Sequence, residues 1–227
     1  MTTIKVARGP TQHEWSPYED NGGSVVAIAG KGFVAVAADT RLSEGYSIYT
    51  REDESKIAQL GPTTFLLSAG MQADRISLQQ QLKFKLKWYE FNNRAPAGTA
   101  AAAQMLSNTL YGRRFFPYYT YNVIAGLDAN GDGVCYTYDA VGCTEPLSYG
   151  SSGSGNTLIE PLMDLHIRRA NQQGKGLATL TVEEAVTLIK DAFTGAGERD
   201  IYTGDFVQIK VLTTQGIQTE IFPLRLD

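Results

Sequence analysis

The sequence predicts an α+β fold, in which antiparallel sheets are covered by helices on their outer faces. Short apolar runs typical of strands occur near the start, in the middle and near the end of the chain. Between these blocks lie pairs of segments with helical features, several of them with the periodicity of amphipathic helices. Strands and helices segregated in this way favour antiparallel pairing, whereas strict strand–helix alternation would favour a parallel sheet.

The start of the chain differs from the rest. Residues 1–22 are polar and contain Pro10 and Pro17, so we expect an extended arm without a core of its own. Residues 23–227 contain no internal repeat or linker and are expected to form one domain. The first residues lack the apolar run of a signal peptide, and no stretch is apolar enough to predict a membrane span.

The first block should contain a hairpin and two further strands. Residues 24–29 (SVVAIA) and 33–38 (FVAVAA) are joined by a glycine-containing turn, which is typical of a β-hairpin. Because both runs are almost continuously apolar, we expect both faces of each strand to be covered. Residues 55–60 and 64–68 are expected to form the other two strands.

Two helices and two strands should follow. The first helix is indicated by residues that recur at spacings of three and four, the pattern of an amphipathic helix: Arg75, Leu78, Leu82, Leu86 and Tyr89. The second helix is the alanine-rich stretch at residues 99–113. Strands return at residues 121–127 and 134–138, on either side of a turn rich in glycine and aspartate.

The last part of the chain repeats this order. A glycine-rich turn at residues 150–155 is expected to open a third helix that runs to about residue 170. The fourth helix has the clearest start, because Thr181 and Glu184 match a capping box, in which each side chain bonds the backbone of the other residue. Two final strands are expected at residues 206–212 and 218–224.

The composition and net charge of the chain exclude several classes of function. The 227 residues are 43% hydrophobic, which is enough for one well-packed domain, and a net charge of −4 argues against a nucleic-acid partner. Cys135 and Cys143 are too few for a disulfide framework or a thiolate metal site, so we expect a reduced intracellular protein with no metal or cofactor. Only His13 and His166 are available for a histidine-assisted site, and we expect His166 to have a core or contact role.

Three motifs have both a chemical and a structural interpretation. Residues 128–133 match the first half of a calcium-binding EF-hand loop, with Asp139 at its twelfth position. Their flanks are expected to be strands, however, and a hairpin turn explains them better. The glycines at 150–155 could cradle a phosphate, although close backbone packing is the simpler explanation. Residues 113–119 (RRFFPYY) could stack single-stranded nucleic acid, but a rigid turn at a core or protein interface suits an acidic chain better.

Three segments together resemble the β subunits of the proteasome. They are the hairpin at residues 22–41, the sequence Gly153-Ser154-Gly155, and residues 198–205 (ERDIYTGD). The similarity extends over residues 22–227. Two further segments, at 40–48 and 113–119, resemble one particular subunit class within that family.

The resemblance implies an N-terminal-nucleophile hydrolase fold, which is a four-layer αββα sandwich of two antiparallel sheets flanked by helices. It also implies a place in an inner β ring of a 28-subunit stacked-ring particle in the cytoplasm and nucleus. The implied partners are the other α and β subunits, with unfolded protein substrates passing through the chamber, and neither nucleic acid nor membrane. An α-type subunit is not expected, because the arm shows no apolar helical stripe.

Active members of this family use an N-terminal threonine, which is exposed when a leader is removed. Its hydroxyl attacks the scissile carbonyl and its own α-amine takes the proton, helped by a nearby lysine. The hairpin places this position at Gly23, which has no attacking atom. The resemblance implies that the rest of the pocket is retained: Asp39, Lys56 (or Ser55, if no extra residue precedes it), Gly70 as the oxyanion amide, and Ser154, Asp200 and Thr203.

We therefore expect a structural and assembly subunit that has no catalytic residues and supports protein degradation by neighbouring β subunits. The alternative is an active amidohydrolase that uses Ser24 after processing. Successive strand residues face opposite sides, so a pocket that Gly23 faces should not be faced by Ser24, and the alternative is disfavoured.

Overall fold

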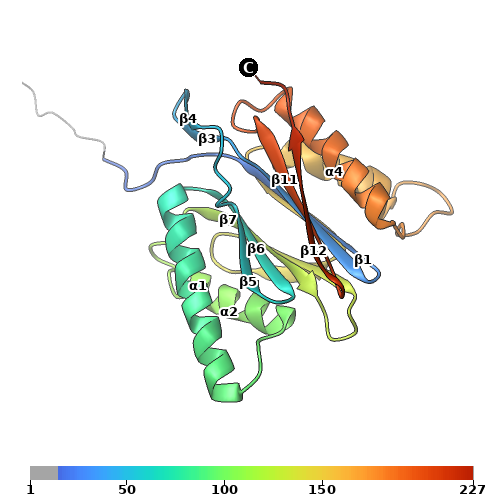
Figure 1. Cartoon of the computed structure of the whole chain (residues 1–227). Coiled ribbons are helices and arrows are strands. Elements are labelled where there is room, and N and C mark those ends of the chain that lie inside the picture. The colour runs from blue at the N-terminus through green and yellow to red at the C-terminus, as the bar shows by residue number, and fades with distance from the viewer. Residues whose placement is uncertain (1–14, 227) are drawn as a thin grey trace, which may run out of the picture.

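Two five-stranded antiparallel sheets stack face to face in a computed structural model, which describes residues 15–226 (Figure 1). The first sheet contains, in spatial order, β10 (Tyr149–Gly153), β1 (Ser24–Gly30), β2 (Phe33–Asp39), β11 (Phe206–Thr213) and β12 (Gly216–Pro223). The second contains β5 (Ile57–Gly61), β6 (Thr64–Gly70), β7 (Thr120–Leu127), β8 (Gly133–Tyr138) and β9 (Thr144–Leu147). Every neighbouring pair within these sheets is antiparallel, as predicted.

Helices cover both outer faces and complete four layers. The helices α1 (Gln72–Asn93) and α2 (Thr99–Tyr111) lie on the second sheet, while α4 (Val182–Gly197) lies on the first (Figure 1). The first sheet also carries α3 (Asn156–Met163), which continues into a π-helix, η1 (Asp164–Arg168). The α+β class and the αββα sandwich are thereby confirmed.

Strand β1 shows how the apolar sequence produces these layers. Val25 and Ala27 pack between the two sheets, whereas Val26 and Ile28 pack against α3 and α4. A strand buried on both faces has apolar side chains at every position, which explains the unbroken run in the sequence. A third apolar cluster joins the second sheet to α1 and α2.

The most distinct local prediction, the start of α4, is confirmed. Thr181 accepts a hydrogen bond from the backbone N–H of Glu184, and the Glu184 carboxylate accepts one from the backbone N–H of Thr181. Each bond satisfies a backbone donor that the first turn of the helix leaves free.

Near the site one prediction is wrong and one element was missed. Residues 150–153 form most of β10, not a turn, because pairing with β1 supplies backbone hydrogen bonds that outweigh the weak strand preference of glycine and serine. In addition, a short hairpin of β3 (Leu42–Glu44) and β4 (Ser47–Thr50) follows β2, where no strand was expected.

The other motifs adopt mostly structural roles. Asp128 accepts hydrogen bonds from the backbone of Asn130 and Asp132 in the turn between β7 and β8, and strands instead of helices flank it. In the 113–119 segment Tyr118 is buried while Phe115 is exposed. His166 is exposed on η1, so the core role is wrong for it, and His13 lies outside the described residues.

Within residues 15–226 no helix is long and apolar enough to cross a membrane. Over the same range no group of histidine, cysteine or carboxylate side chains is arranged to hold a metal ion.

Candidate functional site

The candidate site lies at the start of β1, where the arm joins the sheet. Gly23 has a φ of +93°, and a β-carbon built on it would lie 2.5 Å from both Cε and Nζ of Lys56. It would also lie 3.3 Å from Oδ1 of Asp39. The Lys56 side chain therefore occupies the space that an attacking side chain at position 23 would need.

Lys56 and Asp39 form a buried ion pair. Nζ of Lys56 donates to Oδ1 of Asp39 at 2.8 Å and to the carbonyl oxygen of Arg41 at 2.6 Å. Burial raises the pKa of the Asp39 carboxyl and lowers the pKa of the Lys56 ammonium, and the attraction between the two opposes both shifts. The structure thus places Lys56, and not Ser55, in the pocket; Ser55 bonds Asp53 instead.

Gly70 supplies the amide that the sequence predicted. Its N–H donates to the carbonyl oxygen of Gly22 at 3.2 Å. Gly22 immediately precedes Gly23, so the amide polarises the carbonyl of the Gly22–Gly23 peptide bond.

The three remaining residues lie on the nitrogen side of the same bond. The N–H of Gly23 donates to Oγ of Ser154 at 3.2 Å, and that hydroxyl donates to Oδ2 of Asp200 at 2.7 Å. Thr203 donates to the same carboxylate oxygen at 2.5 Å. All seven residues chosen from the sequence therefore meet around the Gly22–Gly23 bond.

Ser24 does not replace the missing nucleophile in this geometry. Its side chain is fully buried, with Oγ 2.7 Å from Oγ1 of Thr203 and 2.9 Å from the amide nitrogen of Gly155, which donates to it. A side chain at Gly23 would instead point towards Lys56 and Asp39. The two positions face opposite sides, as strand alternation predicts.

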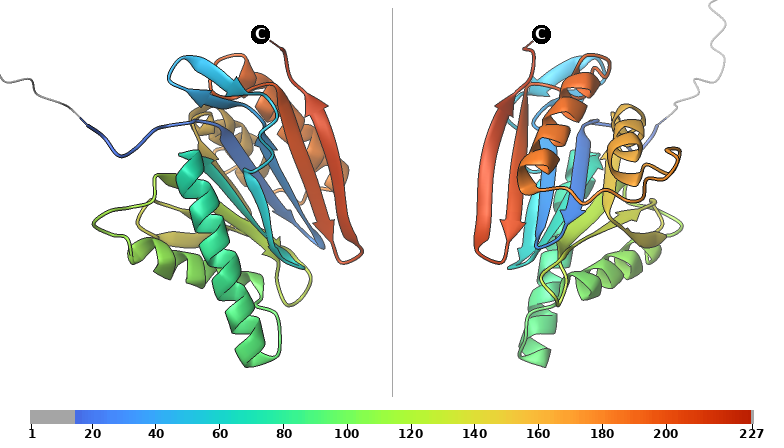
Figure 2. Two further views of the ribbon diagram at one scale, coloured as in Figure 1. Left: turned by 60° about the vertical axis from the view of Figure 1, so that its left-hand side comes forward. Right: turned by 90° about the vertical axis from the view of Figure 1, so that its right-hand side faces the viewer.

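Sequence reasoning missed the residues that hold the arm in place. The backbone N–H of Ser43 in β3 donates to the carbonyl oxygen of Asn21 at 3.4 Å, and Nδ2 of Asn21 donates to the Ser43 carbonyl at 2.9 Å. Oδ1 of Asn21 accepts from the backbone N–H of Gln72 at 2.8 Å. The arm accordingly passes between the β3–β4 hairpin and the start of α1 (Figure 2). Only the Asn-Gly-Gly sequence before β1 could have suggested such a close passage.

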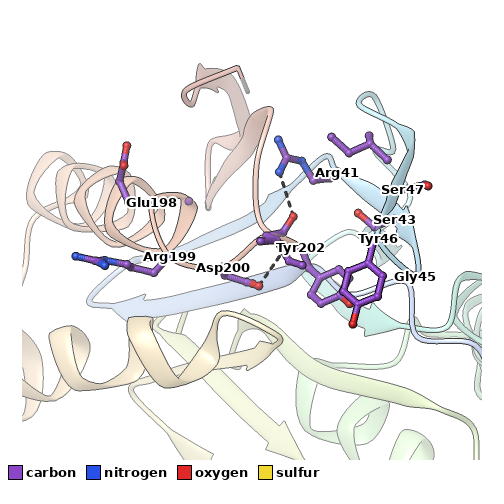
Figure 3. Close-up of a pocket in the computed structure, with 12 residues that line it drawn as sticks. Arg41, Ser43, Gly45, Tyr46, Ser47, Glu198, Arg199, Asp200 and Tyr202 are labelled. Atoms are coloured by element: carbon purple, nitrogen blue, oxygen red, sulfur yellow. Dashed lines mark hydrogen bonds between the residues drawn. The ribbon is translucent and has the colours of Figure 1, made fainter.

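A cavity of about 360 Å³ borders the site. Figure 3 shows it between the hairpin residues around Tyr46 and the turn that carries Asp200 and Tyr202. The Tyr202 side chain also packs against the arm, since a β-carbon on Gly22 would lie 2.5 Å from Cβ of Tyr202. Tyr202 therefore contributes both to the cavity lining and to the contact with the arm.

The chemistry that this arrangement can perform is incomplete. It contains a polarised carbonyl, a buried lysine–aspartate pair and a hydroxyl–carboxylate cluster, but no nucleophilic atom at position 23. Amide hydrolysis by this mechanism needs that atom and a free amine beside it. Fold and site together define the class: a domain with the N-terminal-nucleophile hydrolase fold that has glycine at position 23, where the resemblance places the nucleophile.

Comparisons with known proteins agree with this class. A family model described as "Proteasome subunit" matches residues 19–212. A protein named "Proteasome subunit beta type-1" from Dictyostelium discoideum is 47% identical, covering 100% of both chains. Its namesake in Arabidopsis thaliana is 48% identical over 95% of this chain and 99% of its own length. "Proteasome subunit beta type-6" of Saccharomyces cerevisiae is 37% identical over 96% of this chain and 94% of its own length.

The chain belongs to the proteasome subunit family. These relatives also confirm the narrower resemblance of residues 40–48 and 113–119, which is to the sixth β subunit, called β type-1 in mammalian naming.

Proposed function

We propose that this chain is a non-catalytic structural and assembly subunit of the proteasome core. In this role it occupies one of the two inner β rings of a 28-subunit particle in the cytoplasm and nucleus, in contact with other α and β subunits. It holds neighbouring active subunits in register and lines part of the chamber in which they degrade unfolded proteins.

The single observation that carries the proposal is the glycine at position 23. The rest of the site is present, but Lys56 fills the space where an attacking side chain would lie. In a comparable hydrolase, loss of the nucleophile lowers kcat on the order of a million-fold, which leaves no useful turnover. The relatives' names support membership of the particle, while the absence of catalysis is inferred from this residue.

The test is the native mass and subunit composition of the complex that contains the tagged chain. We expect a particle of several hundred kilodaltons with α and β subunits, and a chain found only as a monomer would contradict the proposal. A Ser24→Ala variant separates assembly from catalysis. Peptide hydrolysis per assembled particle should be unchanged by it, whereas loss of one activity would favour the Ser24 amidohydrolase.

A further inference from the structure

Asparagine is followed directly by glycine at two places in the chain, Asn21-Gly22 and Asn130-Gly131. This pair of residues is chemically reactive, because the backbone nitrogen of the glycine can attack the side-chain carbonyl carbon of the asparagine. Glycine has no side chain to hinder that approach. The reaction requires the asparagine side chain to turn towards the nitrogen, so its rate depends on how firmly the fold holds both groups.

The first of these groups to consider is Asn130, which lies in the turn between β7 and β8 and is exposed to solvent. Within the described residues its side chain makes a single long hydrogen bond, from Nδ2 to Oδ2 of Asp128 at 3.3 Å. The N–H of Gly131 donates to the carbonyl oxygen of Asp128 at 3.1 Å, inside the same short turn. The Asn130 side chain can therefore turn with little loss of bonding, and water reaches the reacting groups.

Asn21, in contrast, is held at both ends of its side-chain amide. Nδ2 donates to the carbonyl oxygen of Ser43 at 2.9 Å, and Oδ1 accepts from the backbone N–H of Gln72 at 2.8 Å. The nitrogen that would attack belongs to Gly22, which is buried and donates to Oδ1 of Asp20 at 2.9 Å. The same reaction at Asn21 must therefore break two well-formed side-chain bonds in addition to the bond of the attacking nitrogen.

We propose that Asn130 is a site of spontaneous deamidation, whereas the fold protects Asn21 from the same reaction. The backbone nitrogen of Gly131 forms a bond to Cγ of Asn130, and the bond between Cγ and Nδ2 breaks. The proton of the backbone nitrogen passes through solvent to Nδ2, which leaves as ammonia. Water then adds to either carbonyl carbon of the cyclic imide and breaks the bond from that carbon to the nitrogen, which gives aspartate or isoaspartate.

The product changes a turn that connects the two sheets. Oδ1 of Asp132 in this turn accepts a hydrogen bond from the backbone N–H of Gly32, in the turn between β1 and β2, at 2.9 Å. Deamidation places a further negative charge between Asp128 and Asp132, and isoaspartate adds a methylene group to the backbone path. The inference goes beyond the proposed function, because the reaction depends neither on assembly nor on catalysis by the domain.

The test ages the folded full-length chain in mildly alkaline buffer and follows both asparagines by peptide mapping with mass spectrometry. Each conversion replaces an amide nitrogen by oxygen and raises the mass of the peptide that contains it. In the folded chain Asn130 should be converted about 10-fold faster than Asn21 or more, because Asn21 must break at least one more hydrogen bond to react.

Two controls separate the effect of the fold from that of the local sequence. Ageing in urea removes the fold, and because glycine follows both asparagines, their rates should then become similar. Asn130→Gln should abolish most of the conversion at position 130, because the longer side chain would have to close a larger ring. The rate at Asn21 in this variant should stay as in the unmodified chain.

Either of two results would overturn the proposal. One is conversion of Asn130 that is no faster than conversion of Asn21 in the folded chain. The other is the same ratio of rates in urea as in the folded chain, which would assign the difference to the local sequence. Both results would leave the proposed function untouched, since that function is tested by the composition of the complex that contains the chain.

Discussion

Nζ of Lys56 lies 2.5 Å from the position that a β-carbon on Gly23 would take. A β-carbon essentially never lies this close to an atom to which it is not bonded, so either residue 23 is glycine or the lysine must move. The lysine is held by Asp39 and by the carbonyl of Arg41, and it is fully buried. The absence of a side chain at position 23 and the placement of Lys56 are therefore two aspects of one packing arrangement.

Gly23→Ala should destabilise the domain more than a glycine replacement made elsewhere in the left-handed region. Strain of the backbone alone costs roughly 1–2 kcal/mol, and overpacking against Lys56 adds roughly 1–3 kcal/mol. Gly32→Ala is the matched control, because Gly32 has a φ of +78° but open space around its β-carbon. Urea unfolding of both variants checks this, and equal losses of stability would contradict the packing argument.

Gly23→Thr should restore the hydroxyl without restoring hydrolysis. The new side chain would compete with Lys56 for the same space, and the amine of residue 23 would still be tied up in the bond to Gly22. Release of free peptide product from a fluorogenic substrate is the measurement. Turnover by this chain would contradict the prediction, because it would show that the Lys56 side chain moves readily to make room for a side chain at position 23.

Lys56→Met should cost about 3–5 kcal/mol of unfolding free energy, because it leaves the Asp39 carboxylate buried without a cation. The double variant Asp39→Asn/Lys56→Met should recover much of that loss, since it removes both charges. Denaturant unfolding of the two single variants and the double variant gives the coupling free energy between Asp39 and Lys56. Additive losses would mean that the pair is not a coupled unit.

Asp53 should contribute stability that is lost in acid. Burial raises the pKa of its carboxyl, but the Arg75 guanidinium and hydrogen bonds from Ser55 outweigh burial and hold the pKa below the usual 3.8. A carboxyl whose pKa is lower in the folded state stabilises it above the unfolded pKa, and this contribution disappears as pH falls through the folded pKa. Stability should therefore fall below about pH 4.

Asp53→Asn should lower stability at neutral pH and flatten the acid decline, as measured by urea unfolding at several pH values. Glu19→Gln removes an exposed carboxylate as a control and should leave the profile unchanged. A decline that stays equally steep in Asp53→Asn would assign the acid sensitivity to other groups.

Thr181→Ala should cost about 1 kcal/mol, because it removes the side-chain acceptor at the start of α4. Thr187→Ala on the exposed face of the same helix is the control, with an expected change of about 0.5 kcal/mol or less. Thermal or urea unfolding distinguishes the two. Similar effects of both changes would mean that the cap has no special role.

The elements that follow local rules could be predicted from the sequence. The capping box at Thr181 lies within four residues, and the apolar hairpin of β1 and β2 needs only its own pattern. By contrast, β10 is made of tyrosine, glycine and serine, and it is a strand only because β1 lies beside it. The β3–β4 hairpin is too short to show a strand pattern.

Part of the candidate site could likewise be predicted from the sequence, and part of it could not. The resemblance located Asp39, Gly70 and Thr203, but an uncertain spacing left Lys56 and Ser55 as alternatives until Nζ of Lys56 was found 2.8 Å from Asp39. The contacts of the arm were beyond prediction, because Gly22 and Asn21 bind largely to backbone atoms of distant residues. Such contacts leave no pattern in the sequence.

The most direct test of the central claim is the intact mass of this chain after treatment with an electrophilic peptide that traps N-terminal nucleophiles. A chain with an N-terminal threonine in the same sample provides the positive control. We predict an unchanged mass for this chain while the control gains the adduct. An adduct on this chain, at Ser24 or at any other residue of the site, would contradict the claim that it does not cut peptides.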